Sequence, residues 1–110
     1  MQTIRIKSGV CIAEINQPFM QFCKALDDVC LPLRVTPVIT SAAEGEHMDG
    51  SFHGAGYGWD VRTRNLIVPQ NVAIGLKQIL AAVDKHFRVI YGDPKHLDHI
   101  HVEYDFKPEY

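Results

Sequence analysis

The strongest constraint on the fold is a pair of apolar stripes with helical spacing, one in each half of the chain. The first stripe follows Asn16-Gln17-Pro18, a typical helix start, and ends before Pro32. The second follows Pro69. Each stripe predicts an amphipathic helix with one buried face. The members are Phe19, Phe22, Cys23, Leu26, Val29 and Cys30 in the first, and Val72, Leu76, Ile79, Leu80, Val83 and Phe87 in the second.

Around these helices the sequence predicts short strands, so we expect an α+β fold. A mostly antiparallel sheet would carry the two main helices on one side. With 110 residues, the chain fits a single domain, 1–110. Pro37 indicates an edge position or an irregular strand. The predicted segments are a strand or hairpin in residues 3–7 and 10–15, a β-rich stretch at 33–40, a loop at 41–58, and strands at 88–91 and 99–104.

The amino-acid composition argues against two classes of binding partner. There are 11 Lys and Arg residues against 13 Asp and Glu, a net charge of −2, which argues against nucleic acid and anionic membranes. No apolar run approaches the ~18 residues that a membrane span needs. The start of the chain lacks the basic and apolar pattern of a secretory signal, so we expect the protein to be cytoplasmic as made. We also expect a monomer.

The segment from His53 to Asp60 carries the first chemical signal, because three glycines occupy every second position within it: Gly54, Gly56 and Gly58. If His53 and Asp60 bind one zinc ion, their donor atoms must lie within roughly 4 Å of each other. A helix would separate the two positions by about 10 Å and an extended strand by more than ~20 Å. Only a chain that doubles back can bring them together, and glycine supplies that freedom.

The second signal is the segment Asp98-His99-Ile100-His101-Val102-Glu103. On a strand, His99, His101 and Glu103 share one face, and the apolar residues between them share the other. Two histidines and one aspartate with an open fourth position are typical of a catalytic zinc site. In this alternation Asp98 falls on the apolar face, so it would reach such a site only from the beginning of the strand.

These two segments together resemble the zinc D-alanyl-D-alanine carboxypeptidase family. The shared patterns are S-x-H-x-x-G-x-[small]-x-D and, further on, D-x-x-H within H-x-H, and the resemblance covers about residues 38–104. That family includes vancomycin-resistance dipeptidases and phage L-alanyl-D-glutamate endolysins, and the hedgehog signalling domain shares its fold. The resemblance implies His53, Asp60 and His101 as zinc ligands. It also implies Asp98 as general base and His99 as the group that steadies the oxyanion.

The chain departs from this family at the strand that precedes the glycine-rich segment. That strand commonly leads into S-G-x-R, whose arginine holds a substrate carboxylate. Here it leads into Ser41-Ala42-Ala43-Glu44, which contains no arginine. Arg62, shortly after Asp60, is the candidate substitute for substrate binding. Gly58 stands at the position that alanine usually occupies in the family, a change of small consequence.

The resemblance implies a zinc-dependent peptidase that cleaves the peptidoglycan stem peptide, either a D-Ala-D-Ala carboxypeptidase or an endolysin-type endopeptidase. A phage enzyme of this kind would reach the cell wall on lysis. Two other functions stay open: a non-enzymatic zinc-binding module of the same fold, and a cytoplasmic dipeptidase. At the level of residues, Asp98 could instead cap a turn, and His99 could instead orient a ligand. Trp59 could line a substrate groove or pack in the core.

Overall fold

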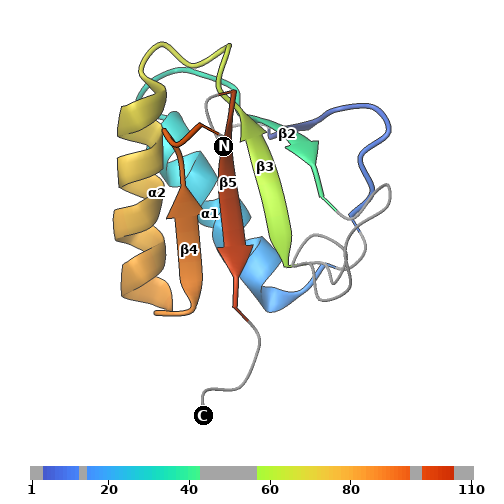
Figure 1. Cartoon of the computed structure of the whole chain (residues 1–110), viewed down its shortest axis with the longest axis vertical. Helices are drawn as coiled ribbons and strands as arrows, with labels where there is room; N and C mark the ends of the chain where they lie inside the picture. Colours follow the sequence, from blue (N-terminus) through green and yellow to red (C-terminus); the bar gives the residue numbers. More distant parts are fainter. Residues whose placement is uncertain (1–3, 13–14, 43–56, 95–97, 106–110) are drawn as a thin grey trace.

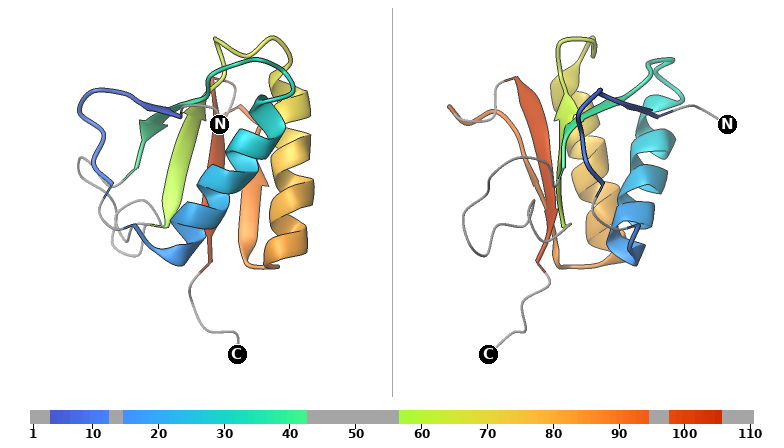
Figure 2. Two further views of the ribbon diagram at one scale, coloured as in Figure 1. Left: turned by 180° about the vertical axis from the view of Figure 1, so that it is seen from behind. Right: turned by 90° about the vertical axis from the view of Figure 1, so that its right-hand side faces the viewer.

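A computed structural model describes residues 4–12, 15–42, 57–94 and 98–105. In these ranges the sheet has the strand order β1-β2-β3-β5-β4, and both helices cover one of its faces (Figures 1 and 2). All pairings are antiparallel except that of β1 with β2. The predicted α+β architecture is confirmed. The elements are β1 (Arg5–Ile6), α1 (Gln17–Cys30), β2 (Val38–Ser41), β3 (Gly58–Arg62), α2 (Pro69–Val83), β4 (Phe87–Ile90) and β5 (His99–Tyr104).

Both helices begin where their sequence signals predict. Asn16 caps α1, since its side-chain oxygen accepts a hydrogen bond of 2.8 Å from the backbone N–H of Phe19. Pro69 occupies the first turn of α2, where its missing N–H costs no helical hydrogen bond. The central residues of each apolar stripe, including Phe22 and Leu76, are fully buried. The second stripe ends earlier than predicted, because α2 stops at the exposed Val83 and Phe87 belongs to β4.

The core lies between the helices and the inner face of β3 and β5. The indole of Trp59 stacks on the ring of Phe22, with ring centroids 5.0 Å apart and an interplanar angle of 7°. Val61, Ile100 and Val102 are buried in the same cluster. Trp59 is 1% exposed, so it is a core residue and not part of a substrate groove. Because side chains alternate along a strand, the neighbours of these residues face the other side of the sheet.

Three sequence predictions about the strands need correction. β1 pairs with β2, so the hairpin alternative for the first segment is wrong: Gly9 turns the chain at φ +90°, residues 10–12 form no strand, and Val10 packs on the core. β2 lies between β1 and β3, so the edge alternative for Pro37 is wrong, whereas the register shift between Ile39 and Ser41 agrees with the irregular-strand alternative. The loop predicted for 41–58 overlaps two strands, because β2 includes Ser41 and β3 begins at Gly58; residues 43–56 lie outside the described ranges.

Asp84 joins the end of α2 to the end of β5. Its carboxylate accepts hydrogen bonds from the backbone N–H of His86 at 2.9 Å and from the Tyr104 hydroxyl at 2.9 Å, and it lies 2.6 Å from His86 Nδ1. The backbone N–H and then the side chain of His86 lower the pKa of Asp84. Asp84 therefore ties the strand that carries His99 and His101 to the helical layer.

We expect Asp84→Ala to lower the free energy of unfolding by about 1–2 kcal/mol at neutral pH, because two hydrogen bonds to a carboxylate are lost. The lowered pKa means that the native state favours ionised Asp84. The contribution is thus complete above the unfolded-state pKa of about 3.9 and disappears as the pH falls through the folded-state value. Urea unfolding from pH 7 to pH 3 measures this. Asp28→Ala, which removes an exposed ion pair with Lys24, is the control. A constant difference between wild type and Asp84→Ala across this range would contradict the assignment.

Candidate metal and substrate site

The face of β3 and β5 opposite the helices carries the polar residues of both strands, and we call it the site face. The antiparallel register places Asp60 opposite His101, Arg62 opposite His99, and Gly58 opposite Glu103. Directly opposed residues in such a pair have Cβ atoms about 4.5–5.5 Å apart. The register therefore brings together residues that the sequence separates widely, and it confirms that His99, His101 and Glu103 share one face.

Asp60 and His101 are the centre of the site face. Oδ1 of Asp60 lies 2.8 Å from Nδ1 of His101, and Oε1 of Glu103 lies 2.8 Å from Nε2 of the same imidazole. All three side chains are largely buried, with exposed fractions of 16%, 13% and 10%. His101 thus has a carboxylate at each ring nitrogen.

These carboxylates control the protonation of His101. Burial by itself disfavours the imidazolium and lowers the pKa of His101. The hydrogen bonds and negative charges of Asp60 and Glu103 oppose this effect and outweigh it, so the pKa of His101 lies above its ordinary value.

The row of charges continues on both sides of this centre. Nε2 of His99 lies 3.9 Å from Oδ1 of Asp60, and Nδ1 of His99 lies 2.6 Å from Oδ1 of Asp98. On the other side, Arg88 of β4 lies 3.7 Å from Glu103 and donates to Asp105 at 2.7 Å. Acidic and basic side chains therefore alternate along this row.

Asp98 precedes β5, at the position from which the sequence expects it to reach the site. Its side chain is 91% exposed. The 2.6 Å contact between its Oδ1 and Nδ1 of His99 connects it to β5. The hydrogen bond from His99, followed by the charge of that imidazole, lowers the pKa of Asp98. Asp98 is therefore a carboxylate at neutral pH, able to accept a proton.

A cavity of about 600 Å³ opens beside this row of charges. Asp60, Arg62, Asp98 and His99, four of the residues singled out in the sequence, line one cavity. His101 adjoins it through Asp60. The complete lining is Lys7, Thr40, Asp60, Arg62, Thr63, Arg64, Asp98 and His99.

The donor set fits zinc in part. Asp60 and His101 provide the carboxylate and imidazole groups that zinc uses, and their 2.8 Å contact is within the roughly 4 Å that separates two ligands of one ion. If Nδ1 of His101 binds the ion, Glu103 stays the partner of the other ring nitrogen, as is usual for a metal-bound histidine. Within the described ranges no group of three or more His, Cys, Asp or Glu side chains is arranged to hold a metal ion. His53, the predicted third ligand, lies outside those ranges.

Sequence reasoning missed part of the cavity wall. Thr63 and Arg64 follow Arg62 directly, so this basic and polar run was a visible signal. Thr40 belongs to β2, at the register shift between Ile39 and Ser41. Lys7 reaches the cavity because β1 pairs in parallel with β2, a long-range contact that local patterns do not reveal.

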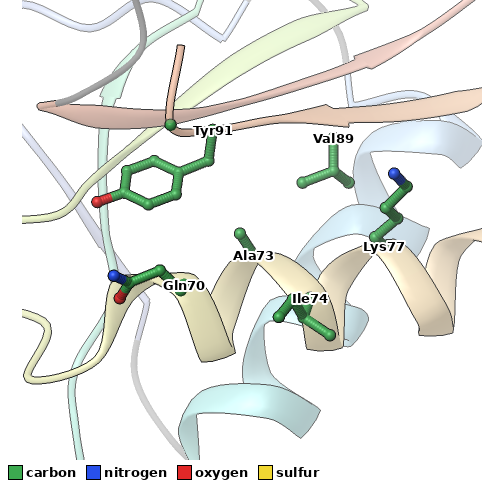
Figure 3. A pocket seen from close by; sticks show the side chains of 7 residues that line it. Gln70, Ala73, Ile74, Lys77, Val89 and Tyr91 are labelled. Carbon is green, nitrogen blue, oxygen red and sulfur yellow. The ribbon is translucent and has the colours of Figure 1, made fainter.

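A second cavity of about 460 Å³ lies between α2 and β4 (Figure 3). Gln70 and Tyr91 stand at one end of it and Lys77 at the other, with Ala73, Ile74 and Val89 between them. No carboxylate, imidazole or thiol lines it. This cavity therefore lacks the carboxylate, imidazole and thiol groups that bind zinc, and the candidate site is the cavity beside Asp60.

Neither helix of the described ranges is long and apolar enough to span a membrane. Comparisons with protein-family models, with curated proteins and with solved structures gave no match to this chain.

Proposed function

We propose that this protein is a zinc metallopeptidase that hydrolyses peptide bonds in the peptidoglycan stem peptide. The observation that carries the proposal is the pairing of Asp60 with His101 across β3 and β5, with a 2.8 Å contact between a carboxylate and an imidazole beside a cavity lined by Asp98 and His99. Two possible ligands, a carboxylate base and a hydrogen-bond donor in one place are the parts that metal-assisted hydrolysis needs.

In this proposal His53, Asp60 and His101 hold the zinc ion. Bound zinc supplies a Lewis acid for the scissile carbonyl and lowers the pKa of a water molecule toward ~7. Nδ1 of His101 would be the ligand atom, because it faces Asp60, the other described ligand, whereas Nε2 faces Glu103. Glu103 then accepts the Nε2 proton and fixes the orientation of the ring.

In this proposal Asp98 accepts and returns a proton, and His99 donates hydrogen bonds. Asp98 accepts a proton from the attacking water and returns it to the amine that leaves. His99, when both ring nitrogens carry protons, donates from Nδ1 to Asp98 and presents its Nε2 proton to the negative charge that develops on the carbonyl oxygen. Arg62 lies opposite His99, and in this proposal it contacts a charged part of the substrate.

Mass spectrometry of the products released from purified bacterial sacculi tests the proposal. The zinc-loaded protein is compared with the same protein in the presence of a chelator, and with His53→Ala. Loss of a terminal alanine identifies a D-Ala-D-Ala carboxypeptidase, and release of stem peptides identifies an endolysin-type endopeptidase. If zinc is bound but sacculi of several peptidoglycan types release nothing, the proposal is wrong and a non-enzymatic zinc module replaces it.

Zinc affinity should depend on Glu103. We expect Glu103→Gln to weaken zinc binding by about 10- to 100-fold, because the neutral amide no longer raises the basicity of the His101 ring. Competition with a chelator of known affinity measures this, and circular dichroism checks the fold. Asp28→Asn, on the surface of α1, removes an equal charge away from the site. Unchanged affinity in Glu103→Gln would show that its contact with His101 does not support a metal ligand.

A further inference from the structure

β4 forms one edge of the sheet in the described ranges, because the strand order ends there and β5 is its neighbour. The backbone N–H of Asp105 donates to the carbonyl of His86 at 2.9 Å. With the register of β4 against β5, this bond means that Arg88 directs its backbone N–H and C=O toward β5, whereas Val89 directs both groups away from it. The described sheet has no strand beyond β4, so Val89 offers a donor and an acceptor to an additional strand.

A groove runs along this edge on the helix side of the sheet, and we call it the edge groove. It consists of the 460 Å³ cavity of Figure 3 and a neighbouring cavity of about 330 Å³, which share Lys77 and Val89 in their walls. One wall is α2, from Gln70 to Ala81, and the other is formed by residues 87–92. α2 lies beyond β4 at this edge of the sheet (Figures 1 and 2), so the helix would form the floor under an added strand.

The floor of the edge groove contains apolar side chains that water reaches. Ile74 is 54% exposed. Together with Ala73 and Val89 it forms the apolar middle of the larger cavity (Figure 3). Neighbouring strands lie about 4.8 Å apart, and every second side chain of an added strand would point toward the helices. Such side chains would fill the two cavities on either side of Lys77.

Lys77 determines the charge of this floor. The residue is exposed, and its side chain extends from α2 toward β4 where the two cavities meet (Figure 3). It makes no ion pair or hydrogen bond with any residue in the part of the chain that the structure describes. α2 itself contains no acidic residue. A carboxylate on the segment that occupies the groove would therefore complement the ammonium group of Lys77.

The charges along this edge disfavour a second copy of the chain as the occupant. If β4 paired with itself about a two-fold axis at Val89, the Lys77 side chains of the two copies would meet. If the axis lay at Arg88, two guanidinium groups would be directly opposed. Like charges in such positions destabilise strand pairing and protect sheet edges from association. The occupant that fits is a different chain, of opposite charge.

We infer that the edge groove binds an extended segment of another protein as an additional strand beside β4. The segment carries an acidic side chain opposite Val89, within reach of Lys77, and apolar side chains two residues before and after it. Hydrogen bonds with the Val89 backbone give affinity, and the side chains in the groove give specificity. The edge groove lies on the side of the sheet opposite the site face, so this inference is independent of the metal and of the proposed hydrolysis.

Peptides that imitate such a segment test the inference. Three acetylated peptide amides have the sequence Thr-X-Thr-Glu-Thr-X-Thr, in which X is Val, Leu or Phe, and each has a partner with Lys in place of Glu. We expect at least one Glu peptide to bind the full chain about 5- to 10-fold more tightly than its Lys partner, as measured by calorimetry. Lys77→Glu should reverse this preference. Lys24→Glu, an equal change of charge at an exposed position of α1, should leave it unchanged.

Amide hydrogen exchange, followed by NMR, tests the backbone contacts. In the free protein the N–H of Val89 should exchange at least about 10-fold faster than that of Arg88, which donates to β5. Saturation with the Glu peptide should slow exchange at Val89 by about 10-fold or more. N-methylation of the peptide at Glu removes the donor that faces β4 and should abolish binding. N-methylation at the Thr that follows, whose N–H faces away, should leave binding within about 5-fold.

Each outcome decides the inference. A Glu preference that Lys77→Glu reverses, together with protection of Val89, supports it. Equal binding of Glu and Lys peptides, no binding of any of the three Glu peptides, or a Val89 amide that stays unprotected at saturation overturns it. Protection of Val89 that rises with protein concentration when no peptide is present would identify a second copy as the occupant, and this also overturns it.

Discussion

Asp98→Asn should lower kcat for peptide hydrolysis by about 10²- to 10⁴-fold while zinc stays bound at the wild-type stoichiometry. The asparagine amide keeps the shape of the side chain but accepts no proton from water. Its neighbour His99 lowers the pKa of Asp98, so the wild-type carboxylate is ionised at the pH where the assay is run. The expected loss is therefore one of catalysis and not of folding, because the side chain is 91% exposed.

Single-turnover kinetics on a peptide substrate, together with metal analysis of each variant, makes this measurement. Asp105→Asn is a demanding control, because Asp105 pairs with Arg88 at the far end of the same row of charges. That variant should retain most of its activity. An Asp98→Asn protein that binds zinc and cleaves at the wild-type rate would remove Asp98 from the mechanism.

Trp59→Ala should reduce the free energy of unfolding by about 3–5 kcal/mol. The indole is 1% exposed, stacks on Phe22 and contacts Phe19 at a centroid separation of 5.7 Å, so its removal leaves a cavity between β3 and α1. Domains of this size are typically stable by only about 5–15 kcal/mol, so the variant would lie close to its unfolding transition. Asp60 follows Trp59 directly, so disruption of the core should also disrupt the site.

Urea unfolding followed by circular dichroism measures the loss, and Trp59→Phe should recover part of it by refilling some of the volume. Met20→Ala, at a position on α1 that is 53% exposed, should change the free energy of unfolding by less than ~1 kcal/mol. A Trp59→Ala protein as stable as Met20→Ala would mean that the aromatic cluster does not hold the helix to the sheet.

The fold could be predicted from the sequence wherever one local pattern determines an element. Asn16 and the apolar stripe after it define α1, and the alternation from His99 onward defines β5 with its polar face. β3 was not predicted, because the glycine-rich segment that leads into it resembles a loop. Only the packing of Trp59 and the pairing with β5 make it a strand. For β1 the strand alternative holds and the hairpin alternative is wrong; its parallel pairing with β2 could not be predicted, because such a pairing has no local signature.

The site could be predicted where side chains able to bind a metal also lie on the same face of a strand. Asp60 and His101 were expected to meet, and the register places them opposite each other. The contact of Glu103 with His101 follows from the same alternation. The contribution of Lys7 did not follow, because it depends on where the sheet places a strand from the other end of the chain.

Site and core residues alternate one by one along β3 and β5, and this limits how the length of the chain can change. Deleting a single residue within β5 would turn His101 toward the helices and Val102 toward the cavity, because the side-chain period of a strand is two. Insertions and deletions inside these strands would destroy the site and the core at once. Descendants of this sequence can therefore vary in length only between the strands, while change within them is restricted to substitution.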